Sequence, residues 1–185
     1  MLPDFENIAY LKSGSPIQLQ AFNILTHSKI LYHLQPFRPV LTGTLPLDLF
    51  VPGKSDLDII IESDRLQIME RRLLDEFSNK KKLTTKLMMI QKRPTLVCRF
   101  IQQDFPIEIF CQPVPVKQQL AYRHMVIEHW LLQKSGPAFR QRVLQLKQGG
   151  MKTEPAFAAA LNLEGDPYQA LLKFEQDEAF RKFIL

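Results

Sequence analysis

The chain has 185 residues, of which 45% are hydrophobic, and carries a net charge of +5 at pH 7. This composition can fill a core and excludes an intrinsically disordered chain. The mild basicity is compatible with a polyanionic ligand such as a nucleotide. No apolar run approaches the roughly 20 residues of a membrane-spanning helix.

The N-terminal segment lacks the basic and apolar regions of a signal peptide. The two cysteines, Cys98 and Cys111, have no nearby Cys or His partners, which excludes a zinc site. Each lies in an apolar run, which favours free buried thiols in a reducing compartment. We therefore expect a cytoplasmic protein that does not bind a membrane.

Two helical patterns occur in the first 80 residues. Ser15 is a good capping residue and is followed by proline, so the apolar periodicity predicts a helix over residues 17–34. A second helix is predicted over residues 63–79, with Ser63 or Asp64 as its cap.

Strand-like runs make up most of the rest of the first 116 residues. The first two runs flank a loop that contains Pro and Gly, and the last three are separated by short turns, which predicts an antiparallel meander. The predicted strands are residues 39–43, 56–62, 82–92, 95–103 and 105–114.

The remaining sequence is helical, with glycines at its breaks. These patterns predict an α+β fold, with an α/β core over residues 1–116 and a helical region over residues 117–185 packed on it as one unit. The predicted helical segments are residues 118–134, 137–148, 154–163 and 166–185, the last divided into shorter helices.

Two aspartates, Asp56 and Asp58, interrupt an apolar strand. Side chains alternate between the faces of a strand, so both aspartates lie on one face and Leu57, Ile59 and Ile61 on the other. Two carboxylates about 4 Å apart repel by roughly 4 kcal/mol at an effective dielectric of about 20. A shared proton or a bound cation relieves this repulsion, and oxygen ligands on one face suit Mg²⁺ or Mn²⁺.

A third acid, Glu108, lies within the apolar run "FPIEIF". If its strand lies beside that of Asp58, the carboxylates converge and could hold two metals that clamp a transferring phosphoryl group. Upstream, Gly43 would let backbone N–H groups approach a phosphate closely, and the Thr44 hydroxyl could donate a further hydrogen bond.

These residues resemble the signature of the DNA polymerase β-type nucleotidyltransferase superfamily: a hydrophobic residue, Gly, then Gly or Ser, nine to thirteen residues, an Asp-x-Asp strand and a later acid on another strand. The chain has "LTGT", eleven residues, "DLDI" and later "IEIF". It departs from the signature at Thr44, whose methyl group would add bulk to the phosphate loop. The wider pattern, with "QLAYRHM" and "MKTEPAF" downstream, resembles a small uncharacterised bacterial family of this superfamily, a domain of unknown function.

The resemblance implies a nucleotidyltransferase palm, which is a mixed, largely antiparallel sheet with helices on one face. It implies a reaction in which a hydroxyl attacks the α-phosphate of an NTP and pyrophosphate leaves. It also implies site roles. Asp56 and Asp58 would bind both metals, Glu108 would bind one and activate the acceptor hydroxyl, and Gly43 and Thr44 would hold the triphosphate.

Two further residues are candidates for nucleotide binding. Ser55 immediately precedes the first aspartate of the motif. Arg99 is the one charge in its apolar strand, and a tight turn near Gln103 would place it opposite Glu108. There Arg99 could form an ion pair with Glu108 or bind a phosphate. A register slip of one residue would turn it to the other face.

Polar residues of the helical region leave alternatives open. His124 and Glu128 share a helix face, where a cap over the site or an exposed pair is favoured over a metal pair. Tyr122 could stack on a base or pack against the sheet. Arg123 could hold a phosphate or remain solvated. Residues 152–154 could be only a helix N-terminus, or could bind an anion in the cleft.

Three functions remain open at this level. The first is a metal-dependent transfer of NMP from an NTP to a hydroxyl of a small molecule, protein or RNA. The second is a catalytically inactive, antitoxin-like module that binds a nucleotide or a partner. The third is a nucleic-acid-binding protein with a vestigial site, which the lack of a basic stripe interleaved with aromatic residues disfavours.

Overall fold

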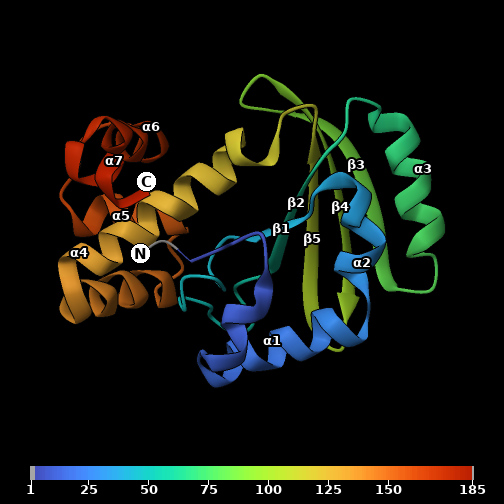
Figure 1. Cartoon of the computed structure of the whole chain (residues 1–185), viewed down its shortest axis with the longest axis horizontal. Helices are drawn as coiled ribbons and strands as arrows, with labels where there is room; N and C mark the ends of the chain where they lie inside the picture. Colours follow the sequence, from blue (N-terminus) through green and yellow to red (C-terminus); the bar gives the residue numbers. More distant parts are fainter. Residues whose placement is uncertain (1–2, 185) are drawn as a thin grey trace.

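The computed structural model describes residues 3–184, which form an α+β fold around a five-stranded mixed sheet (Figure 1). The strands are β1 (Val40–Thr42), β2 (Leu57–Glu62), β3 (Lys81–Ile90), β4 (Arg93–Gln102) and β5 (Phe105–Gln112). The helices are α1 (Pro16–His27), α2 (Ile30–Leu34), α3 (Leu66–Glu76), α4 (Leu120–Gln148), α5 (Thr153–Ala160), α6 (Pro167–Leu172) and α7 (Glu178–Ile184). Short 3-10 helices are η1 (Ile8–Ser13), η2 (Gln35–Phe37), η3 (Val116–Gln118) and η4 (Lys173–Gln176). Within the described part of the chain, no helix combines the length and apolarity that crossing a membrane requires.

The sheet has the order β1-β2-β5-β4-β3. Strands β3, β4 and β5 form the predicted antiparallel meander, while β5 pairs with β2 in parallel. A parallel pair needs a long crossover, which α3 and the β3–β4 hairpin supply here. The pairing of β2 with β5 brings Asp58 directly beside Glu108.

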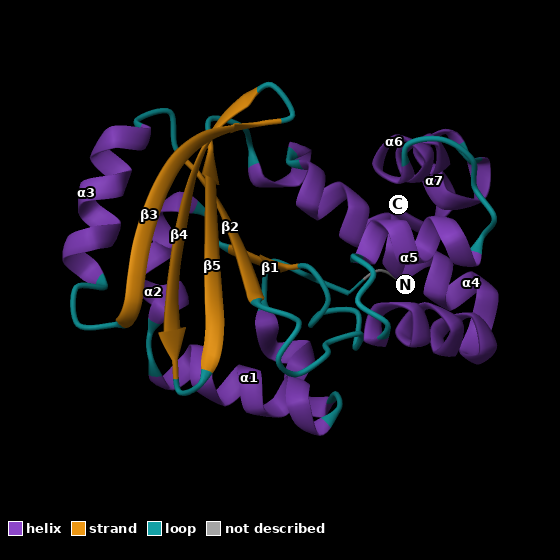
Figure 2. Cartoon of the chain, turned by 180° about the vertical axis from the view of Figure 1, so that it is seen from behind, coloured by secondary structure: helices purple, strands orange, loops and turns teal. Residues whose placement is uncertain are grey.

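Helices α1, α2 and α3 cover one face of the sheet (Figure 2). Leu57, Ile59 and Ile61 of β2 are fully buried in the core on this side, as the alternation of β2 predicts. Asp58, on the opposite face, therefore belongs to the side of the sheet that faces the helical region.

The predicted helix over residues 17–34 is two helices, which is a correction to the sequence-based interpretation. Lys29 adopts a left-handed conformation (φ 55°), which ends α1 and starts α2 in a new direction. Helix α3 also begins later than predicted, because Arg65 rather than Ser63 or Asp64 is its capping position. The Ser63 hydroxyl instead accepts a hydrogen bond from the Arg65 N–H.

The helical region packs around a second core. Its long helix α4 is interrupted at Gly136 (φ 76°), just before Pro137, between the two predicted helical segments. Trp130, Phe157 and Phe180 are buried in this core, which also includes residues of β1, β2 and the loop that joins them. A domain division near residue 116 stays a prediction.

Candidate active site

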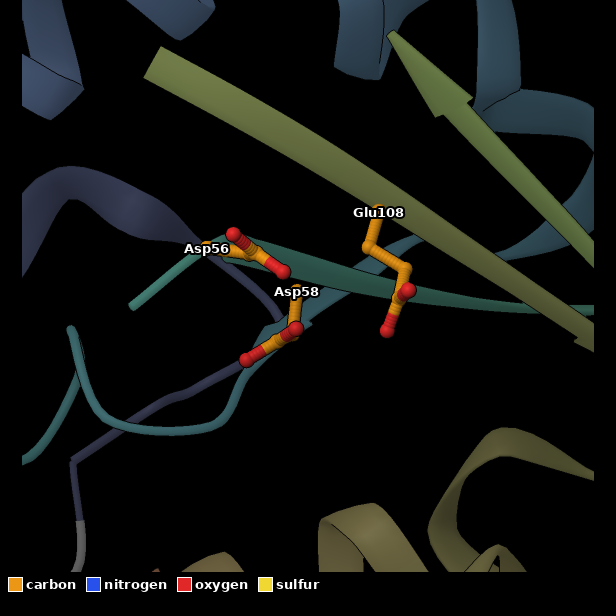
Figure 3. Close-up of side chains that lie close together, drawn as sticks. All are labelled: Asp56, Asp58 and Glu108. Atoms are coloured by element: carbon orange, nitrogen blue, oxygen red, sulfur yellow. The ribbon is translucent and has the colours of Figure 1, made fainter. Parts of the chain in front are cut away.

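Three carboxylates converge at one end of the β2–β5 pair. Asp56 directly precedes β2, Asp58 lies within it, and Glu108 is the neighbour of Asp58 on β5. One oxygen from each carboxylate lies within 4.8 Å of the others. Figure 3 shows the three side chains extending into the same space. We call these three residues the carboxylate triad.

The electrostatics of the triad favour uptake of a cation or a proton. Burial raises the pKa of Asp58 well above its usual range, and the charges of Glu108 and Asp56 raise it further. Burial also raises the pKa of Glu108, against the lowering effect of Arg99. Three converging carboxylates are the hard oxygen donors that Mg²⁺ and Mn²⁺ prefer, so the donor set fits a divalent cation.

Arg99 pairs with Glu108 across β4 and β5, as the predicted register requires. Its Nε forms an ion pair with Glu108 Oε1. The Arg99 side chain is 52% exposed and that of Glu108 is 11% exposed, so the pair lies at the edge of the site with the arginine towards solvent.

Gly43 packs directly against the triad. It adopts a left-handed conformation (φ 72°), and a Cβ at this position would collide with Asp58 Oδ2 and lie 3.0 Å from Asp58 Cγ. The next residue, Thr44, is buried, and its Oγ1 has no hydrogen-bond partner among residues 3–184. The glycine therefore permits close packing, and the threonine leaves a hydroxyl available to a ligand.

The loop between β1 and β2 is held by hydrogen bonds within the loop and by hydrogen bonds to α4. The Ser55 hydroxyl accepts a hydrogen bond from the Val51 N–H at 3.1 Å, so it stabilises the loop while also lining the cavity. Arg140 of α4 donates through Nη1 to the Leu47 carbonyl. Lys54 donates to the Gln148 carbonyl, which joins the loop to the end of α4.

A cavity of about 780 Å³ separates the triad from the helical region. Its helical side includes His124 and Glu128 of α4 and Glu154 of α5. Lys147, near the end of α4, is also buried in the cavity wall and donates to Thr153 Oγ1 at 2.9 Å. Burial raises the pKa of Glu128 well above its usual range, and burial lowers that of Lys147.

The structure brings the predicted site residues together around this cavity. It is lined by Gly43, Thr44, Ser55, Asp56, Asp58, Arg99, Glu108, His124, Glu128, Lys152 and Glu154, all considered from the sequence. The interpretation of His124 and Glu128 as an exposed pair is wrong, because both are 3% exposed. Arg123 instead forms an ion pair with Glu175.

Other cavity residues were not predicted. Lys54, Lys147 and Tyr168 line it, as does Phe110 of β5. Lys147 lies between a run of apolar residues and Gly149-Gly150, which is typical of a solvated helix end. Its burial depends on packing against distant segments, so the local sequence holds no signal for it.

The comparisons with known proteins agree with this geometry. A family model described as Domain of unknown function (DUF4269) matches residues 23–174. No curated protein is significantly similar to the chain.

Several solved structures share the fold. A non-canonical poly(A) polymerase complex, GLD-2–GLD-3, is 15% identical, with a TM-score of 0.56 over 96% of this chain and 64% of that one. A GLD-2/RNP-8 complex is 15% identical, with a TM-score of 0.51 over 89% of this chain and 65% of that one. The Cid1 poly(U) polymerase with Mg 3′-dATP bound is 16% identical, with a TM-score of 0.51 over 73% of this chain and 41% of that one.

At these identities the similarity establishes the fold alone, which is a nucleotidyltransferase fold. The chain spans less than two thirds of the length of each of these solved chains.

Proposed function

The chain belongs to the family described as Domain of unknown function (DUF4269), and we propose from the geometry of its site that it is a metal-dependent nucleotidyltransferase. It would transfer NMP from an NTP to a hydroxyl acceptor. The observation that carries the proposal is the carboxylate triad opposite Gly43 and the unpartnered Thr44 hydroxyl in one cavity. The volume of this cavity is within the usual range for small-molecule sites.

Asp56, Asp58 and Glu108 would hold Mg²⁺ or Mn²⁺. The triad fits such an ion because its carboxylates provide converging oxygen donors whose mutual repulsion a cation removes. The bound metal would neutralise charge on the phosphates and on the leaving pyrophosphate. The similar Cid1 structure, with Mg 3′-dATP bound, supports this choice of cofactor and of an NTP ligand.

The residues of the chain itself would bind and orient the nucleotide. The Thr44 hydroxyl would donate to a phosphate oxygen, and the backbone N–H groups of Gly43 and Thr44 would approach the triphosphate closely because Gly43 has no side chain. The ammonium groups of Lys147 and Lys152, which also line the cavity, would offset phosphate charge.

In the transfer step, the acceptor oxygen would bond to the α-phosphorus while the bond from that phosphorus to the bridging oxygen breaks and pyrophosphate leaves. Glu108 would accept the proton of the acceptor hydroxyl. Arg99 would orient the Glu108 carboxylate through their ion pair.

The test compares wild-type protein with Asp58→Asn and with the control Asp64→Asn, which changes an exposed aspartate outside the cavity. Binding of a non-hydrolysable NTP is measured by calorimetry with and without Mg²⁺, and pyrophosphate release is measured with the NTP itself. We expect Mg²⁺-dependent binding and release in wild type and the control, and neither in folded Asp58→Asn. Release that is unchanged in Asp58→Asn would refute the assignment, and binding without any turnover would favour the inactive module.

A further inference from the structure

The cavity has an acidic wall opposite the triad that the proposed transfer step does not use. It consists of His124, Glu128 and Glu154. Glu128 is 3% exposed, and its Oε1 has no hydrogen-bond partner among the residues that the structure describes. Because an unpaired acceptor is unfavourable in a buried position, this oxygen is available to a hydrogen-bond donor of a ligand.

The other two members of the wall also offer acceptors. His124 Nε2 lies 3.0 Å from the Tyr168 carbonyl oxygen, which can only accept, so Nε2 carries the hydrogen. The other ring nitrogen, Nδ1, lies 3.8 Å from Glu154 Oε1, beyond hydrogen-bond distance. The Glu154 side chain is 23% exposed and so is only partly covered by the surrounding residues.

Two lysines of the cavity, Lys147 and Lys152, carry charge close to its carboxylates. The charge of Lys147 acts on Glu128 and Glu154 and also on Asp58, and that of Lys152 acts on Glu108. Lys147 forms no ion pair with any described residue. A triphosphate bound as proposed would compensate both ammonium groups and would leave Glu128 and Glu154 without a countercharge.

We propose that the acidic wall binds the acceptor through a primary ammonium group, so that the acceptor is a hydroxyl compound that also carries an amine. An ammonium group has a positive charge and three N–H donors, which match two carboxyl groups and an imidazole nitrogen. The amino group of a nucleobase is neutral and has two hydrogens, so it would leave the two carboxyl groups without a countercharge. This inference rests on the proposed function, because it is the bound triphosphate that compensates the lysines.

The test uses three matched pairs of probes: glucosamine and glucose, ethanolamine and ethylene glycol, and putrescine and butane-1,4-diol. Their affinities are measured by calorimetry or ligand-observed NMR with Mg²⁺ and a non-hydrolysable NTP both in excess, so that the triad is saturated with metal and the triphosphate compensates the lysines. The proteins are wild type, Glu128→Gln, Asp58→Asn and the control Glu164→Gln, which removes an exposed carboxylate outside the cavity. The affinity of each protein for a non-hydrolysable NTP is measured in parallel.

We expect at least one amine to bind wild type and Glu164→Gln at least about tenfold more tightly than its neutral partner, and Glu128→Gln to lose this preference while it keeps the NTP affinity of wild type. The proposal is overturned if no amine binds more tightly than its partner. It is also overturned if Glu128→Gln weakens NTP binding instead, which would place the nucleobase on this wall, or if only Asp58→Asn reduces amine binding, which would place the amine on the triad. Failure of the proposed function has a different result, namely no Mg²⁺-dependent NTP binding by wild type.

Discussion

Gly43→Ala is expected to destabilise the protein by two separable effects. The new side chain must adopt the left-handed backbone conformation of Gly43, which costs roughly 1–2 kcal/mol. Its Cβ would also collide with Asp58 Oδ2, which forces the carboxylate or the loop to move. Overpacking of this kind costs roughly 1–3 kcal/mol, so the free energy of unfolding should fall by about 2–5 kcal/mol in total.

Gly53→Ala is the matched control. Gly53 lies in the same loop with nearly the same φ (75°), and a Cβ there would meet nothing within 4 Å. Gly53→Ala should therefore lower the free energy of unfolding only by the cost of the left-handed backbone conformation, about 1–2 kcal/mol. Equilibrium denaturation in urea without metal measures the free energy of unfolding of both variants. Mn²⁺ titration measures the affinity of the triad for metal. Metal affinity should fall in Gly43→Ala and stay unchanged in Gly53→Ala.

A double-mutant cycle with Asp58→Ala separates the collision from other effects. Without the Asp58 carboxyl group, Gly43→Ala should cost about as much as Gly53→Ala. The reasoning would be refuted if Gly43→Ala and Gly53→Ala were equally destabilising, or if the cost of Gly43→Ala did not depend on the Asp58 side chain.

Three further predictions concern the charges around the cavity. Arg99→Leu removes the group that lowers the pKa of Glu108, so the pKa should rise and Mn²⁺ affinity should decline more steeply with falling pH than in wild type; an identical pH profile would contradict this. Glu128→Gln should stabilise the metal-free protein in denaturation experiments. The pKa of Glu128 is higher when folded than its ordinary 4.5, so the carboxyl contributes most stability below pH 4.5 and less as the pH rises, and the advantage of the variant should grow with pH. Arg140→Ala frees the Leu47 carbonyl, so amide exchange in the loop over residues 44–55 should accelerate with no change in exchange at β4.

The sequence predicted the sheet because its signals are local. The alternation in β2, with Leu57, Ile59 and Ile61 on one face and Asp58 on the other, reflects the two environments of a strand that separates a core from a cavity. The register of β4 with β5 also follows from a short turn, which is why the pairing of Arg99 with Glu108 was predicted correctly.

Features that depend on tertiary packing were harder to predict. The break between α1 and α2 occurs at Lys29, which has no sequence signal for a left-handed conformation. The burial of Glu128 and Lys147 depends on how α4 and α5 pack over the sheet, and a polar residue on a helix is usually solvated. The acidic wall was therefore assigned no role of its own, although the sequence analysis considered His124 with Glu128 and, separately, residues 152–154.

The most direct test of the account is a crystal structure of the full chain with Mn²⁺ and a non-hydrolysable NTP, in which anomalous scattering locates the metal. The account predicts an anomalous peak coordinated by Asp56, Asp58 and Glu108, with the triphosphate against Gly43 and Thr44. A nucleotide bound in the cavity without metal at the triad, or metal bound only elsewhere, would contradict the central claim.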